Sequence, residues 1–234
     1  MIDQLRTDLK KAANPKKAKL LQGFFKTGKG EYGEGDIFLG ITVPQLRKIA
    51  LKFKNLSFAE IKTLLKSKIH EERLIALLIL VSNFEKGLSQ KKNYKFYLAC
   101  TKYINNWDLV DLSASRIVGR FLFENPGLKP ILYKLARSQN LWERRIAIIS
   151  TLYFIVKGEF KETFKIAEIL LNDRHDLIQK AVGWMLREVG MKCSVSAEKE
   201  FLSKHYKQMP RTMLRYAIER FPEEDREKYL KGRI

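Results

Sequence analysis

The sequence has few of the residues on which metal-binding or disulfide-rich proteins depend. Two cysteines and three histidines occur among 234 residues, and none shows CxxC or HExxH spacing. Cys100 and Cys193 lie in unrelated segments, so we expect two reduced, buried thiols. The histidines (His70, His175 and His205) are isolated from one another. We therefore predict no metal and no cofactor.

Long apolar runs are missing as well. No stretch approaches the roughly 18 uncharged apolar residues that a membrane-spanning helix needs. The first residues, MIDQLRTDLKKAANPKK, alternate charged and apolar residues and lack the apolar core of a signal peptide. With 45% hydrophobic and 30% charged residues, the composition is typical of a soluble globular protein. We expect a cytoplasmic protein without membrane association.

Acidic residues are scarce relative to basic ones. Lysine and arginine number 45 against 26 aspartate and glutamate residues, giving a formal net charge of +19. Such an excess destabilises a compact chain through self-repulsion unless a polyanion is the partner. Nucleic acid is the commonest such partner, because its phosphates release counterions to Lys and Arg. An anionic membrane surface is a second possibility, and a generally lysine-rich composition is the neutral explanation.

Strand-like alternation is absent, and apolar residues recur at helical spacing along nearly the whole chain. We predict helices over residues 2–12, 15–26, 43–54, 57–67, 69–86, 89–104, 107–124, 127–138, 141–157, 160–172, 175–190, 195–207, 210–220 and 223–231. Ser57 followed by Glu60 is typical of a capping box at a helix start.

Residues 27–42 differ from the rest of the chain, since they hold five of the 13 glycines and show no helical pattern. We expect a long, mobile loop there. Such loops are often functional, and a flexible connector is the equally weighted alternative. No Gly-Lys-Ser/Thr opens a helix after it, so it is not a nucleotide-binding P-loop.

Several helices begin with related phrases. These phrases lie at 72–78, 144–149 and 179–185, with a weaker copy at 214–218, so their starts are 72, 35 and 35 residues apart. The first interval therefore spans two units, and the intervening unit falls near residue 109. A period of this length with two helices per unit predicts an all-α, HEAT-like helical-repeat solenoid, with residues 1–234 as one domain.

In such a solenoid the second helix of each unit lines one concave wall. The repeated phrases carry a basic residue near each helix start: Arg73, Arg145, Lys180 and Arg215. We expect these residues to form a basic stripe along a concave groove that follows phosphates. Solvated caps or ion pairs between repeats are the alternative.

The unit near residue 109 has no such basic residue and reads Asn-Trp-Asp-Leu-Val-Asp over 106–111. Trp107 and Asp111 are four residues apart, so they share one helix face. Arg145 follows one period later and Trp184 one period after that, with Arg187 on the same face as Trp184. We predict that these side chains face one groove. The alternative is two core tryptophans and a charge at a helix start.

The sequence resembles the AlkD-type alkylpurine DNA glycosylases, a HEAT-repeat family of DNA repair enzymes. The resemblance spans roughly residues 15–220. It depends on Phe38-Leu39-Gly40-Ile41 with Pro44 and Arg47, on Asn106-Trp107-Asp108 with Asp111, on Trp142 with Arg145, Ala147 and Ile148, and on Ile178-Gln179-Lys180-Ala181 with Gly183-Trp184 and Leu186-Arg187-Glu188.

The resemblance implies a role for each matching residue. Asp111 matches the catalytic carboxylate, Trp107 and Trp184 match the tryptophans that flank the deoxyribose of the lesion, and Arg145 matches a basic residue beside the acid. Arg187 and Arg47 match positions expected to hold DNA phosphates, to which we add Lys180. Where the family has a tyrosine that touches DNA, this chain has Phe24, or else Tyr32 of the glycine-rich loop.

The implied reaction agrees with elementary chemistry. Glycosidases usually need two carboxyl groups around an oxocarbenium-like transition state. A purine alkylated at N3 or N7 already carries positive charge, so the leaving base needs no acid and one carboxylate is enough. In the resembled family the damaged base is not drawn into a pocket, unlike the base-flipping route.

We therefore expect a monofunctional, monomeric glycosylase that removes 3-methyladenine and 7-methylguanine from duplex DNA during base excision repair. It would be nucleoid-associated when bound to DNA. No lysine stands in an obvious Schiff-base context, so lyase activity is not expected. The main alternative is a non-catalytic HEAT-repeat module that binds DNA structure or damage. A protein-interaction scaffold is disfavoured by the net charge of +19.

Overall fold

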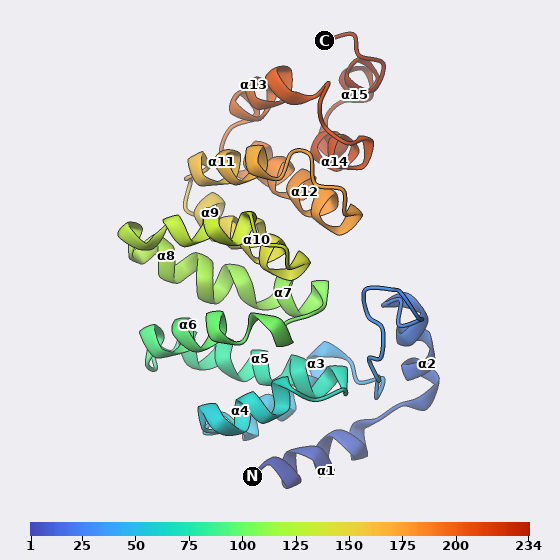
Figure 1. The fold of residues 1–234 in the computed structure, drawn as a ribbon, viewed down its shortest axis with the longest axis vertical. Helices are drawn as coiled ribbons and strands as arrows, with labels where there is room; N and C mark the ends of the chain where they lie inside the picture. The colour runs from blue at the N-terminus through green and yellow to red at the C-terminus, as the bar shows by residue number, and fades with distance from the viewer. The chain divides into compact units, whose positions relative to one another are not determined.

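The computed structural model describes all residues from 1 to 234 and is built from helices joined by turns (Figure 1). The one instance of β-pairing is an isolated parallel bridge between Ile37 and Ile69. The prediction of an all-α helical-repeat fold is confirmed. No helix combines the length and the apolar character that crossing a membrane would require.

The contacts divide the chain into two compact units, residues 1–113 and 114–234. The first contains α1 (Ile2–Ala12), α2 (Pro15–Phe24), α3 (Val43–Lys52), α4 (Phe58–Leu65), α5 (His70–Glu85), α6 (Gln90–Ala99), η1 (Thr101–Tyr103) and nearly all of α7 (Trp107–Ala114). The second contains η2 (Ser115–Gly119), α8 (Arg120–Glu124), η3 (Pro126–Leu128), α9 (Pro130–Ala136), α10 (Leu141–Val156), α11 (Lys161–Ile169), α12 (Asp176–Lys192), α13 (Val195–His205), α14 (Arg211–Ala217), η4 (Ile218–Arg220) and α15 (Glu223–Leu230). That residues 1–234 form one domain stays a prediction.

The expected long helix over 107–124 is present, but it is not α-helical throughout. Its middle, η2, is a π-helical turn between α7 and α8. Such turns insert one residue into the hydrogen-bond ladder and are frequent near functional sites.

Helix α5 is the centre of the first unit. It packs against α3, α4 and α6, and 13 of its 16 residues are buried. Beyond its charged first turn, α5 is apolar on nearly all sides, so it lacks the polar face of a surface helix. In contrast, α2 has no buried residue, although it carries Leu20, Leu21 and Phe24.

The second unit has two layers of helices. One layer runs from η2 through α10 and α12 to α14, and the other contains α9, α11 and α13 (Figure 1). Phe164 of α11 stacks on Phe201 of α13, with 4.8 Å between their ring centroids. Gly183 lets α12 and α14 approach closely, because a Cβ at this position would collide with the carbonyl oxygen of Met213.

Helix starts follow the expected capping chemistry. The predicted capping box at Ser57 is confirmed: its hydroxyl accepts from the Glu60 amide, and the Glu60 carboxylate accepts from the Ser57 amide at 2.8 Å. The side chain of Asn14 caps α2, whose first residue is Pro15. Both devices satisfy amide groups that the first helical turn leaves without partners.

The glycine-rich segment over 27–42 is not a free connector. Asp36, Phe38 and Gly40 are buried, and Ile37 is paired with the residues around Ile69. Gly40 has a φ of +80°, and a Cβ there would collide with the Asn14 carbonyl, so only glycine fits. The expectation of a mobile loop is therefore corrected for its second half, which is bound to the body of the unit.

Two consecutive buried carboxylates at the start of α5 hold this arrangement together. Glu71 accepts hydrogen bonds from the amides of Leu39, Gly40 and Ile41 at 2.9, 2.8 and 3.3 Å. Glu72 accepts two bonds from the Arg6 guanidinium, at 3.0 and 3.1 Å. Glu71 thus fixes the end of the loop, and Glu72 fixes α1. These charge-assisted hydrogen bonds also compensate for the cost of burying the two carboxylates.

Candidate active site

The candidate catalytic residues of the first unit lie at the start of α7. Asn106 is fully buried, and its side-chain oxygen accepts a 2.8 Å hydrogen bond from the Trp107 amide. The Asp108 carboxylate accepts from the Leu109 amide at 2.9 Å. Polar side chains therefore bind the exposed amide groups of the first turn, which fixes where the helix begins.

Trp107 is held by a stack of aromatic rings. Its ring stacks on Phe25, whose other neighbour in the stack is Phe38, with centroid separations of 5.1 and 5.0 Å. Phe24 meets Trp107 edge-on at 5.9 Å, and the indole N–H donates to the Tyr32 hydroxyl at 3.3 Å. The two candidates for the family's DNA-touching tyrosine, Phe24 and Tyr32, thus both contact Trp107.

Beneath this stack lies a buried network of charges. His70 is 2% exposed, and its Nε2 lies 2.8 Å from Asp108 Oδ2, while its Nδ1 lies 3.5 Å from Asp36 Oδ2. Asp36 also accepts from the Arg73 guanidinium at 2.5 Å, and Arg73 donates to the Ser67 carbonyl at 2.8 Å. Burial by itself lowers the pKa of His70, but the bonds to Asp108 and Asp36 outweigh it and raise that pKa.

Asp111 lies one helical turn beyond Trp107, on the same face of α7. It is partly exposed, so it is not enclosed in the core of its unit. Its negative charge adds to the effect of burial in raising the pKa of the Tyr97 hydroxyl, which bonds to Ser113 at 2.9 Å. Asp111 is therefore an accessible carboxylate with a fully buried hydroxyl nearby.

The second unit contains the other predicted residues. Arg145 of α10 is 5% exposed and donates to the Leu177 carbonyl at 2.5 Å. Trp184 of α12 is partly exposed, and its indole N–H donates to Glu188 at 3.0 Å. Glu188 Oε1 also lies 3.8 Å from Arg187. Trp184 and Arg187 are thus adjacent along α12, with one carboxylate touching both.

Two predicted phosphate-binding residues are engaged with acidic neighbours. Arg187 is 17% exposed and forms an ion pair with Glu219 of η4. Lys180 is paired with Asp176 at 2.9 Å, one turn back along α12. A carboxylate therefore competes with phosphate for each of these side chains. By contrast, Arg47 of α3 is exposed.

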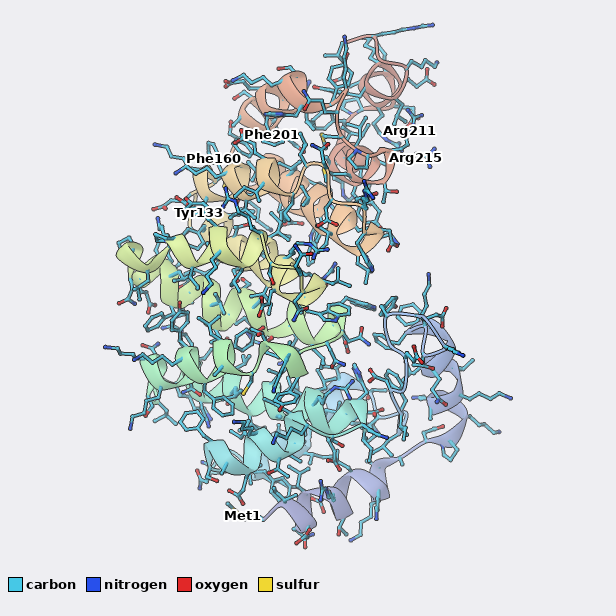
Figure 2. All side chains as sticks on the ribbon, viewed as in Figure 1. Met1, Tyr133, Phe160, Phe201, Arg211 and Arg215 are labelled. Carbon is cyan, nitrogen blue, oxygen red and sulfur yellow. The ribbon has the colours of Figure 1, made fainter.

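The proposed basic stripe requires a correction. Arg73 and Arg145 are 3% and 5% exposed, so they do not line an open surface. Arg73 instead forms a buried ion pair with Asp36 of the glycine-rich segment. Arg215 is exposed on α14, as Figure 2 shows, and Lys180 is partly exposed. The basic residues at the starts of the inner helices therefore differ in role. Arg73 pairs with a buried carboxylate and Arg145 is buried against a backbone carbonyl, whereas Lys180 and Arg215 lie at the surface.

Sequence reasoning missed the contribution of His70, Asp108 and Asp36. In the sequence His70 looks isolated, because its partners are 38 and 34 residues away. The one available signal was the run His-Glu-Glu-Arg over 70–73, placed directly before a strongly apolar stretch. Four buried polar residues in succession need partners. Without the structure, however, the sequence 70–73 cannot be told from an ordinary solvent-exposed helix start.

Both cysteines are free, as expected, although Cys193 is only partly buried. No group of three or more His, Cys, Asp or Glu side chains is arranged to hold a metal ion. Asp111 and Trp107 belong to the first unit, and Arg145, Trp184 and Arg187 to the second. That the two sets face one groove stays a prediction.

The structure defines an all-α helical-repeat protein, and its sequence is strongly basic. The family model described as DNA alkylation repair enzyme matches residues 5–221, and the chain belongs to that family.

A solved structure has a similar fold. It is described as a predicted DNA alkylation repair enzyme from Enterococcus faecalis, and it aligns with a TM-score of 0.73 at 19% sequence identity. The alignment covers 90% of this chain and 97% of that one. No curated protein matches the sequence. At this identity the likeness concerns the fold, and the family match carries the assignment to DNA alkylation repair.

Proposed function

We propose that the protein is a monofunctional DNA glycosylase that hydrolyses the N-glycosidic bond of cationic alkylated purines, 3-methyladenine and 7-methylguanine, in duplex DNA. The observation that carries the proposal is the pairing of an accessible carboxylate, Asp111, with an indole one turn away, Trp107, in a chain of the DNA alkylation repair family. A basic protein with a net charge of +19 also suits a polyanionic substrate.

In the proposed reaction, the bond between the sugar and the alkylated base breaks with the electron pair leaving on the base. The base already carries a positive charge, so it departs neutral without an acid catalyst. Positive charge develops on the sugar instead, and the Asp111 carboxylate stabilises it and orients the attacking water. The water oxygen then bonds to C1′ of the sugar, and the proton that it loses passes through Asp111 to the solvent. Stabilising charge where it develops in the transition state is the largest contribution that many enzymes make.

The tryptophans would exclude water and contact the cationic sugar. Trp107 is suited to this because three neighbouring aromatic side chains, Phe24, Phe25 and Tyr32, hold its ring in place. Cation–π contacts of this kind contribute about 0.5–2 kcal/mol each. Trp184 would act from the other side of the sugar. Arg145 is 5% exposed, so it would keep Asp111 ionised rather than hold a phosphate, since a cation gives no direct help to a cationic centre.

Release of free bases tests the proposal. Purified protein is incubated with N-methylated duplex DNA, and released 3-methyladenine and 7-methylguanine are measured by chromatography. We expect release by the wild type, near-complete loss in Asp111→Asn, and full activity in Asp3→Asn, which removes an exposed carboxylate on α1. Normal excision by Asp111→Asn would show that the catalytic acid is assigned wrongly.

The same reaction separates the competing functions. If the wild type binds methylated duplex but releases no base, the non-catalytic binding module is correct. A strand break without alkali treatment would contradict the monofunctional assignment. Binding to undamaged duplex is expected to weaken with salt, with a log–log slope of about −4 to −8 for a handful of phosphate contacts. A flat response would remove the case for a phosphate track.

A further inference from the structure

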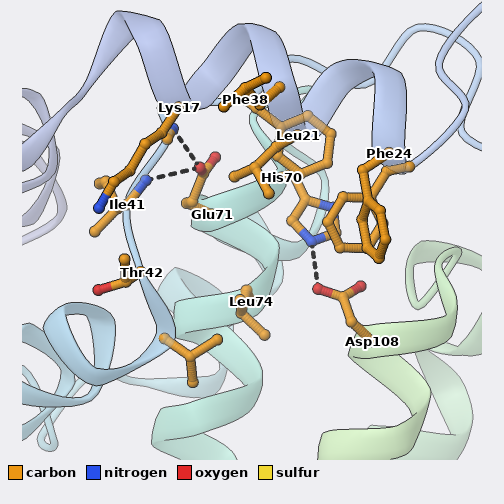
Figure 3. A pocket seen from close by; sticks show the side chains of 14 residues that line it. Lys17, Leu21, Phe24, Phe38, Ile41, Thr42, His70, Glu71, Leu74 and Asp108 are labelled. Carbon is orange, nitrogen blue, oxygen red and sulfur yellow. Dashed lines mark hydrogen bonds and ion pairs between the residues drawn. The ribbon is translucent and has the colours of Figure 1, made fainter.

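The first unit contains a cavity that the proposed chemistry does not use. Its volume is about 320 Å³, and it lies between α2 on one side and α5 and the 40–43 segment on the other (Figure 3). This volume is at the lower end of the range of roughly 300–1,000 Å³ found for small-molecule sites. The cavity therefore suits one ring system better than a whole nucleotide.

The walls of the cavity are nearly all apolar, and several are aromatic. Phe25 and Phe38 form the inner end, and Phe24 stands at the mouth with 64% of its surface exposed. Leu20, which also lines the cavity, is 73% exposed. Together with Leu21, these side chains form an apolar face of α2 that the chain itself leaves uncovered, since no residue of α2 is buried.

One polar group at the inner end of the cavity narrows the choice of occupant. Asp108 lines the cavity and is 18% exposed. Its oxygens accept from His70 and from the Leu109 amide, but a carboxylate can accept about four hydrogen bonds. It can therefore accept from an N–H group on the ligand. A hydrocarbon chain in the same place would leave this charge desolvated and uncompensated.

The segment beside the cavity is strongly basic. Residues 9–30 contain seven lysines and no acidic residue. Lys16, Lys17 and Lys19 are exposed on α2, and Lys17 also lines the cavity. These lysines lie next to one exposed aromatic ring, that of Phe24. Lysines beside an exposed ring are the combination with which proteins bind unstacked nucleic-acid strands: lysine holds the phosphates and a base stacks on the ring.

We propose that this cavity receives one nucleobase displaced from the base stack of bound DNA, while the lysines of α2 hold the neighbouring phosphates. The base enters past Phe24 and Leu20, lies against the Phe25 and Phe38 end, and donates an N–H bond to Asp108. The proposal depends on the proposed function only in that the partner is DNA. It adds a second contact, separate from the carboxylate that performs the cleavage.

The probe is a short undamaged duplex carrying a single bulged 2-aminopurine, compared with the same duplex fully paired. We expect binding of the bulged duplex to be about tenfold tighter, within the range measured for stacking of one base on protein. Fluorescence of the bulged 2-aminopurine should shift to shorter wavelength when the base leaves water for an apolar cavity. Equal affinity for the two duplexes, or an unchanged spectrum, would overturn the proposal.

A variant that fills the cavity provides the decisive comparison. Val43 lines the mouth and is 38% exposed, so Val43→Trp adds a large ring there without disturbing the core. Leu51→Trp is the matched control, because Leu51 is on the same helix, is 61% exposed and does not line the cavity. We expect the preference for the bulge to disappear in Val43→Trp and persist in Leu51→Trp. If both variants keep the preference for the bulged duplex, the displaced base does not bind in this cavity.

The phosphate contacts are tested by Lys17→Ala. Loss of one phosphate contact should reduce the magnitude of the salt slope by about one for the bulged duplex. An unchanged slope would overturn this part of the proposal. A different result would overturn the whole cavity proposal. If the protein binds anionic phospholipid vesicles, loses that binding in Val43→Trp and shows no preference for the bulged duplex, then the lysines and the apolar face of α2 bind a membrane surface.

Failure of this proposal is distinguishable from failure of the proposed function. Asp111→Asn should keep the preference for the bulged duplex while losing base release. If the wild type excises methylated bases but binds both duplexes equally, the cavity proposal alone is wrong. If the protein binds neither duplex, both proposals are wrong.

Discussion

His70 Nε2 lies 2.8 Å from Asp108 Oδ2, and this bond joins the first turn of α5 to the first turn of α7 within the first unit. Asp108 follows Trp107 directly and precedes Asp111 by three residues, so the bond fixes the segment that carries the candidate catalytic pair. The ring of His70 also stacks on Phe38 at 4.5 Å, next to the stack that holds Trp107.

Asp108→Asn should destabilise the protein by about 2 kcal/mol at pH 6, as expected for a hydrogen bond to a charged group. The pKa of His70 is raised in the folded state, so stabilisation by its charged partners is complete below its unfolded pKa. That stabilisation is lost as pH rises through the folded pKa, where His70 becomes neutral. The effect of the substitution should therefore shrink at pH 9, measured by denaturant unfolding at both pH values.

The groups that face His70 from the surrounding elements are Asp108, Asp36 and Arg73. Asp176→Asn, which removes a carboxylate on the surface of α12, is the control and should have little effect at either pH. If Asp108→Asn costs as much at pH 9 as at pH 6, then the charge of His70 does not contribute, and the bond is merely a neutral hydrogen bond.

Glu198 should make the second unit less stable as pH rises. It is 2% exposed, and burial raises its pKa to about 8, against the opposing effects of Arg187 and Lys199. Between the ordinary pKa of glutamate and pH 8, the folded state keeps a proton that the unfolded state releases. Stability should therefore fall by up to roughly 1.4 kcal/mol per pH unit in this range and level off above it.

Thermal unfolding of the wild type and Glu198→Gln between pH 5 and pH 9 measures this contribution. The glutamine variant should show a flatter profile and exceed the wild type in stability at pH 8. Glu200→Gln is the control, because Glu200 is exposed on the same helix and paired with Lys204. Parallel profiles for Glu198→Gln and the wild type would mean that the carboxyl is ionised when folded.

Gly183→Ala should lower the free energy of unfolding by about 1–3 kcal/mol, the usual cost of overpacking. A Cβ at this position would collide with the Met213 carbonyl and with Tyr216 Cβ, so α14 would have to move away from α12. Gly23→Ala is the matched control within helix α2. No atom lies within 4 Å of its added Cβ, so it should stabilise by about 0.5–1 kcal/mol. Denaturant unfolding measures the change in free energy of unfolding for both variants. If both substitutions change it in the same direction, then α12 and α14 are not closely packed at Gly183.

Arg187→Ala should weaken DNA binding equally for all sequences, because phosphate contacts position a protein without reading bases. Glu219→Gln should have the opposite effect, a several-fold gain in affinity, since Glu219 competes with phosphate for the same guanidinium. Titration of labelled duplexes of two unrelated sequences at several salt concentrations measures both changes. A loss confined to one sequence would contradict a phosphate contact, and unchanged affinity in Glu219→Gln would mean that Arg187 does not leave its ion pair.

Much of the architecture could be predicted from the sequence. Apolar spacing located the helices, because one-sided burial imposes a period of 3.6 residues on any helix that packs on a core. The internal repeats indicated stacked helix pairs, and the pair Trp107 and Asp111 shares a helix face by geometry alone. The glycines of the 27–42 segment correctly excluded a helix there, because several of them have positive φ.

The roles of single charged residues depended on tertiary structure. Arg73, predicted on a groove surface, is buried against Asp36, and Arg187 is held by Glu219. Nothing in the sequence links His70 to Asp108, but in the folded chain they lie 2.8 Å apart. The physical reason is that helical periodicity is a local consequence of burial, written into neighbouring residues. An ion pair requires only that two distant residues meet, and nothing in the local sequence around either residue records the other.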